Sequence, residues 1–192
     1  MSALSMLVGR FGAIKLAGVG IFLGFLITLN VATVRADGLI VYGDKWAFTI
    51  IEPPGWIGDT TAGAADGMNI VLYPKGSSWS KAPVVIYGIV LGIKPAEIKR
   101  QRQEDRRLNE EHYGKQIKWR DVEINKPYKA GQVYAGAEMH AKSYENMVWI
   151  GNEQANVVVL FVLNARDGKK PQRKIIDLFD AVIRSIVLMR KT

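Results

Sequence analysis

The sequence predicts an α+β fold: a mostly antiparallel central sheet of six to seven strands, one helix between the sheet halves and an amphipathic C-terminal helix. Two apolar runs, 83–91 and 157–163, have strand length and no polar alternation, which is typical of strands covered on both faces. Alternating segments separated by turn residues flank these runs and indicate hairpins. Helices packed on such a sheet make an α/β/α sandwich.

The first sheet half is predicted from four short segments. A piece at 39–42 leads into 46–52, where aromatic and branched residues alternate with smaller ones as in a strand. Two prolines end this strand, because proline donates no backbone hydrogen bond. Glycine, alanine and threonine dominate 58–67, which indicates a loop. A strand at 69–73 follows and ends at a Pro-Lys-Gly turn.

The helix between the sheet halves is predicted to begin at Pro95, a favourable first-turn residue, and to end near Tyr113, just before Gly114. Nearly all of its residues are polar, and Ile98, Leu108 and Tyr113 are its only plausible apolar contacts. We therefore expect a surface helix that contacts the sheet only through one narrow stripe of these apolar residues.

The second sheet half is predicted from strands at 117–124, 133–142, 147–151 and 157–163. A terminal helix starts near Pro171, and its apolar residues recur at the helical period. The stripe comprises Ile175, Phe179, Val182, Ile183 and Ile186, widened by Ile176, Leu178 and Val187. No repeat or linker interrupts this part of the chain, which predicts a single domain at 37–192.

Two groups of residues carry a family resemblance. The first is WAFTI at 46–50, followed by Pro-Gly-Trp at 54–56. The second is the hairpin VWIGNE at 148–153, the apolar strand 157–166 and the terminal helix. Together they resemble the PsbP-like α/β/α family of photosystem II extrinsic subunits and small bacterial envelope proteins, over most of the chain after the leader. The resemblance implies this fold and a non-enzymatic binding or assembly factor, and it brings no catalytic residues.

The first 36 residues predict export. Basic residues precede nineteen uncharged residues at 16–34, and the segment closes with Val-Arg-Ala at 34–36, a pattern of secretory signal peptides. A retained membrane anchor is the alternative, because nineteen residues at about 1.5 Å each span roughly 28 Å. Either way the body is expected in the periplasm or outside the cell, free or anchored to the inner membrane.

Composition excludes several classes of function. The chain has 192 residues and no cysteine, which removes disulfide scaffolds, cysteine-ligated metals and thiol catalysis. Its formal charge of +8 comes from 26 basic and 18 acidic residues, and three of the basic residues lie in the leader. The remainder therefore carries 23 − 18 = +5, short of the basic excess of a nucleic-acid binder.

The sequence offers little catalytic chemistry. Glu138 and His140 share a strand face, but no third metal ligand is suitably spaced, so we expect an exposed strand with a Glu–His contact and no metal. His112 suits a helix C-terminus. The chain lacks G-x-S-x-G, and the glycine spacing at 58–63 lacks the P-loop lysine, so no cofactor is expected. No pair of carboxylates stands out.

The candidate binding residues are Lys99, Arg102 and Arg106, which share one face of the polar helix. Interleaved acids allow a merely salt-bridged face, whereas the alternative is a docking surface for an envelope protein or an anionic membrane surface. The loop at 57–68 is a second candidate.

We expect an exported, non-enzymatic binding or assembly factor of the bacterial cell envelope. Contact with a membrane is expected only if the leader stays attached as an anchor. A small periplasmic hydrolase using carboxylates and a membrane-anchored structural subunit are the alternatives.

Overall fold

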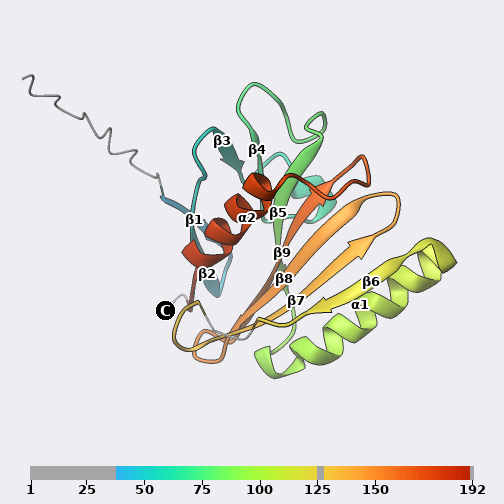
Figure 1. The fold of residues 1–192 in the computed structure, drawn as a ribbon. Coiled ribbons are helices and arrows are strands. Elements are labelled where there is room, and N and C mark those ends of the chain that lie inside the picture. Colours follow the sequence, from blue (N-terminus) through green and yellow to red (C-terminus); the bar gives the residue numbers. More distant parts are fainter. Residues whose placement is uncertain (1–37, 125–127, 191–192) are drawn as a thin grey trace, which may run out of the picture. The chain divides into compact units, whose positions relative to one another are not determined.

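The computed structural model describes residues 38–124 and 128–190, which form two antiparallel sheets and two α-helices (Figure 1). The leader predicted at 1–36 and the turn predicted at 125–127 lie outside the described residues. Within the described ranges no helix is long and apolar enough to cross a membrane.

The large sheet has seven strands in the order β3-β4-β5-β9-β8-β7-β6, and every neighbouring pair is antiparallel. Its central pair, β5 with β9, joins the two halves of the chain through the two apolar runs. The strands are β3 Trp56–Asp59, β4 Ile70–Pro74, β5 Val84–Leu91, β6 Lys118–Val122, β7 Gln132–His140, β8 Tyr144–Asn152 and β9 Val157–Ala165. The predicted antiparallel α+β fold is thus confirmed, whereas β3 lies partly in the stretch predicted as a loop.

A separate three-stranded sheet has the order β1-β2-β10, with β1 Gly38–Tyr42, β2 Trp46–Ile51 and β10 Val187–Arg190. The sequence predicted one sheet and assigned Val187 to the terminal helix, which was wrong. Helix α2, Arg173–Ser185, ends earlier, and the next residue, Ile186, is already extended with a ψ of 128°. The chain can then pair β10 with β2.

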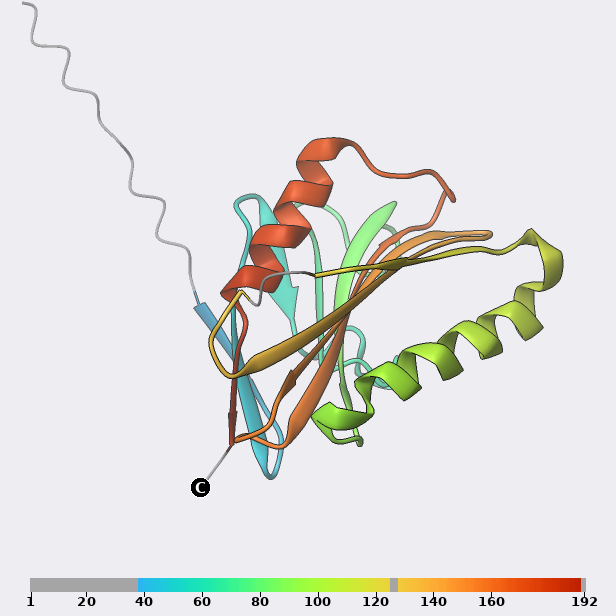
Figure 2. The same cartoon turned by 60° about the horizontal axis from the view of Figure 1, so that its bottom comes forward.

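Helix α2 and the small sheet cover one face of the large sheet, and helix α1, Ile98–Tyr113, lies on the other (Figure 2). Short 3-10 turns at Ala64–Asp66, Pro95–Glu97 and Gly114–Gln116 complete the described elements. The main core lies on the α2 side, where Phe48 from β2 meets Phe161 from β9 edge to face, with ring centroids 5.8 Å apart. The predicted stripe of α2 supplies Phe179, Val182 and Ile183 to this core.

Helix α1 attaches to its face of the sheet mainly by polar side chains. Ile98 is buried and Tyr113 partly buried, as predicted, but Leu108 is 47% exposed and is not an anchor. The partly buried positions between the two ends are Gln101, Arg102, Asp105 and Asn109. The apolar sheet face beneath this helix contains Trp149, Met147 and Val162.

Candidate binding groove

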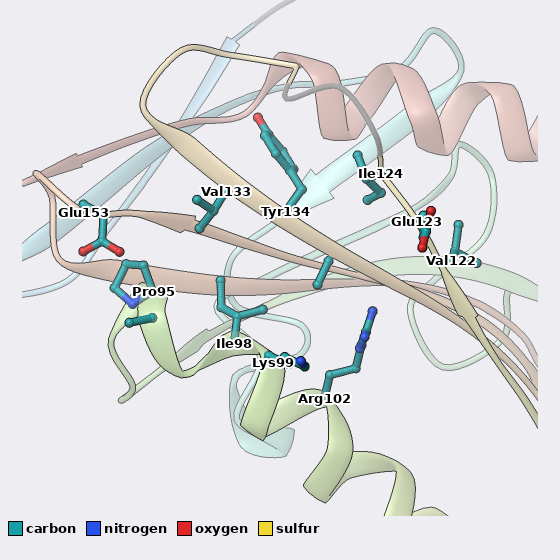
Figure 3. A pocket seen from close by; sticks show the side chains of 12 residues that line it. Pro95, Ile98, Lys99, Arg102, Val122, Glu123, Ile124, Val133, Tyr134 and Glu153 are labelled. Atoms are coloured by element: carbon teal, nitrogen blue, oxygen red, sulfur yellow. The ribbon is translucent and has the colours of Figure 1, made fainter.

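A groove of about 430 Å³ lies where the N-terminal end of α1 meets the edge of the large sheet (Figure 3). Helix α1 contributes Ile98, Lys99 and Arg102, and strand β7 contributes Val133. Ile98 is buried, while Val133 is 44% exposed, so the groove has an apolar lining that solvent reaches.

One wall of this groove is an unpaired edge of β7. Strand β6 pairs with β7 only from Gly136 to His140, so residues 132–135 have β8 as their one strand neighbour among the described residues. The N–H of Gln132 donates to the carbonyl of Lys129 within a turn. The open edge is therefore short, about three residues, and it faces the groove.

Arg102 is built into the groove wall and is not a free surface cation. Its side chain is 19% exposed, and Nη2 lies 3.3 Å from Oδ2 of Asp121 on β6. Nη1 donates to the carbonyl oxygen of Gly136 on β7, also at 3.3 Å. Nε is buried without a hydrogen-bond partner in the described structure. The guanidinium thus ties α1 to two strands, and Asp121 matches its charge.

The other two predicted cations differ from Arg102 and from each other. Lys99 is exposed, lines the groove and makes no ion pair with any described residue. Arg106 lies outside the groove lining and donates from Nε to Glu110 at 2.7 Å. Two of the three predicted residues therefore meet in the groove, and of these two only Lys99 lacks an ion pair with a described residue.

The outer face of α1 carries the ion pairs that its mixed sequence allows. Besides the Arg106–Glu110 pair, Arg107 contacts Glu104 at 2.6 Å and also contacts Glu111. Exposed pairs of this kind each contribute under about 1 kcal/mol to stability.

The groove has balanced charge. Glu123, just after β6, and Glu153, in the turn between β8 and β9, line it together with Lys99 and Arg102. An arrangement of apolar side chains, an open strand edge and charges of both signs suits a polypeptide segment better than a small polyanion. The second predicted candidate, the loop at 57–68, does not line this groove.

Glu138 belongs to a second polar cluster, on the α2 side of the sheet. Its side chain is 11% exposed and accepts hydrogen bonds from Nη2 of Arg120 at 2.6 Å and from Nζ of Lys170 at 3.1 Å. Burial raises the pKa of this carboxyl, but the two cations outweigh burial and hold it below its usual range.

His140 shares the face of Glu138, as predicted, but it packs edge to face on Tyr144, with ring centroids 4.7 Å apart. The expectation of an exposed strand with a Glu–His contact was therefore wrong, because cations from β6 and the segment before α2 reach Glu138 instead. His112 packs on Tyr113 at the end of α1.

Two carboxyls beneath α1 were not singled out by the sequence. Burial raises the pKa of Asp105, which accepts a hydrogen bond from Gln101 at 2.8 Å. Burial also raises the pKa of Glu145, which accepts one from Asn164 at 2.8 Å. Asp105 follows Ile98 by seven residues, a helical spacing that could have placed it on the inner face. Neither carboxyl lines the groove.

In the described ranges, no group of three or more potential metal ligands is placed to hold an ion.

Comparison with known proteins gives similarity to solved structures only, since no family model and no curated protein matches the chain. Cyanobacterial PsbP from Synechocystis sp. PCC 6803 is similar at 17% identity, with 90% of this chain and 96% of that chain covered and a TM-score of 0.47. The Saccharomyces cerevisiae Ran-binding protein Mog1p is similar at 15% identity, with 79% and 94% covered and a TM-score of 0.48. A PsbP protein is thus among the structures to which this chain is similar.

Proposed function

We propose that this chain is an exported, non-enzymatic binding or assembly factor of the bacterial cell envelope. Its binding site is the groove between α1 and β7, and its ligand is an extended segment of an envelope protein. The observation that carries the proposal is the edge of β7 at 133–135, which has no strand on its outer side among the described residues, is lined by apolar side chains and is flanked by the unmatched charge of Lys99.

The groove supports recognition by strand addition. An extended segment placed beside β7 would continue the antiparallel ladder where β6 leaves it, and main-chain hydrogen bonds would supply affinity. Ile98 and Val133 would contact apolar side chains of the segment. Lys99 would pair with a carboxylate of the segment, while Arg102 keeps the groove wall in place through Asp121.

Export is supported by the composition of the leader. Residues 16–34 are uncharged, and the basic residues of the leader lie mostly before them. N-terminal sequencing of the protein from its native host identifies the mature form: Asp37 as first residue means a cleaved signal peptide, and Met1 or Ser2 means a retained anchor.

The groove is tested by a photo-crosslinking amino acid at Val133 in the full chain, produced in the native host. We expect an adduct with an envelope protein, and Lys99→Glu should reduce its yield at least about fivefold, because it removes an attraction of about 1 kcal/mol and adds repulsion. Arg106→Glu is the matched control, since it reverses a charge on the same helix outside the groove, and should leave the yield unchanged.

If both variants reduced the adduct yield equally, binding would depend on the general charge of α1 and not on the groove. An adduct that neither variant affects would exclude Lys99 from recognition.

A further inference from the structure

The small sheet has two apolar faces, and described residues of the chain cover only one of them. Strands in such a sheet alternate inward and outward, and the inward residues, such as Phe48 and Ile50, are fully buried in the core. The outward side chains carry no charge, and they are Ile40, Tyr42, Ala47, Thr49, Ile51, Val187 and Met189.

This outer face reaches solvent over its whole width. Ile40 is 62% exposed, Tyr42 is 70% exposed and Ile51 is 43% exposed, while the other four residues are partly exposed. An antiparallel sheet with one free face ordinarily alternates apolar and polar residues, so that polar side chains meet water. A contiguous uncharged face of this kind marks a contact surface.

A second copy of the chain fits this face poorly. The face has seven side chains, whereas a stable protein interface uses about 20–30 residues from each partner. A lipid surface needs no such area, because several apolar side chains are enough for a body already held by an anchor.

The covalent chain limits the distance between the start of this sheet and the end of the apolar segment. Residues 16–34 are uncharged, and β1 begins at Gly38, so four peptide units of about 3.5 Å each allow at most about 14 Å between Val34 and Gly38. Lys45, in the turn between β1 and β2, is exposed at one end of the sheet, next to the exposed Asp44. Tyr42 is a residue type that favours the membrane interface.

We infer that the outer face of the β1-β2-β10 sheet lies against the headgroup region of a lipid bilayer, with residues 16–34 retained as the membrane anchor. The contact would fix the orientation of the body on the membrane, with the outward side chains of the sheet in the interfacial layer. The inference depends on export and on retention of the leader, and it is independent of the groove.

The absence of cysteine makes a direct test possible. A single cysteine is introduced in the full chain, Ile40→Cys in one variant and Leu108→Cys in the matched control, which replaces another exposed large apolar residue on α1. Each variant is labelled with an environment-sensitive fluorophore and reconstituted in vesicles of 70% phosphatidylcholine and 30% phosphatidylglycerol. Quenching is measured with a nitroxide carried on the lipid headgroup and with iodide in the water.

We expect the lipid-borne nitroxide to quench the probe at residue 40 at least about twofold more strongly than the probe at residue 108, with the opposite order for iodide. Equal quenching of the two probes would overturn the inference, because the anchor alone would then explain any proximity. Disulfide-linked dimers of the Ile40→Cys chain would assign the face to a second copy. Asp37 as the first residue of the mature protein would also overturn it, without affecting the groove.

Discussion

At the scale of single residues, neighbours decide what each cation on α1 can do. Arg102 and Lys99 lie one turn apart, yet Asp121 and the carbonyl of Gly136 engage Arg102 while Lys99 remains unmatched among the described residues. The helical period correctly predicts that both lie on one side of α1. It does not predict the ion pair of Arg102, because its partner Asp121 lies on a strand nineteen residues further along the sequence.

The pair of cations on Glu138 predicts a pH-dependent stability. The pKa of Glu138 is lower in the folded chain than its usual value of 4.5, so the carboxylate stabilises the fold above that value and loses this contribution as the pH falls through the folded pKa. Glu138→Gln should therefore cost about 1–2 kcal/mol of unfolding free energy at pH 7, since Arg120 and Lys170 remain half exposed.

Urea unfolding of both proteins at pH 7 and at about pH 3 measures this difference, which should shrink towards zero in acid. Asp105 and Glu145, whose pKa values are raised, give stability the opposite pH dependence. Both proteins contain them, so the difference between the two proteins at each pH cancels this contribution. A difference that is the same at both pH values would assign the role of Glu138 to packing.

At the scale of elements, α1 is a helix whose inner face is mostly polar. Its sequence predicts a thinly attached surface helix, and the structure agrees, with Ile98 and Tyr113 at its two ends against the sheet. The sequence also offered Leu108 as a contact, but that side chain points away, since ten residues from Ile98 do not complete whole turns of 3.6 residues.

Ile98→Ala should destabilise the protein by about 2–4 kcal/mol, because it removes a buried branched side chain where α1 meets the sheet. Leu108→Ala is the matched control on the same helix and should change stability by less than about 0.5 kcal/mol. Urea unfolding followed by circular dichroism gives both values. If the two variants lowered the unfolding free energy by similar amounts, the middle of α1 would also contribute to its attachment to the sheet.

Short strands mark the limit of what the sequence predicts about elements. The long strands β5 and β9 and the stripe of α2 follow from apolar runs and helical periodicity. Strand β10 has four residues and β3 has four. Strand β10 is defined by pairing with a strand distant in sequence, and β3 by pairing with β4 across the long loop at 60–69. Local patterns of that length are shared by loops and helix ends, so the pairing itself is needed to recognise them.

At the scale of the whole molecule, β2 joins the two ends of the described chain by pairing with β1 and with β10. Leu188 of β10 is 4% exposed and reaches the main core. The groove also arises from the arrangement of distant segments, because among the described residues the edge at 133–135 is open where β6 leaves β7. Its cations could be predicted from the helix, but its strand wall could not.

Deleting residues 187–192 should lower the unfolding free energy by about 2–4 kcal/mol, because β2 loses a partner strand and the core loses Leu188. Deleting only 191–192 is the control, since it keeps all of β10, and should leave stability within about 0.5 kcal/mol of the intact chain. Urea unfolding measures both. Equal stability of the two truncated chains would show that β10 contributes little to the fold.

The pairing of β10 with β2 also determines when the small sheet can form during synthesis of the chain. Ribosomes release the N-terminal strands first, and β1 with β2 alone is a two-stranded hairpin, which is marginally stable in water. The small sheet closes only after residues 187–190 have emerged. If the chain is exported as proposed, it lacks its closing strand until the end of its passage through a translocation channel, and this delay would favour transport before folding is complete.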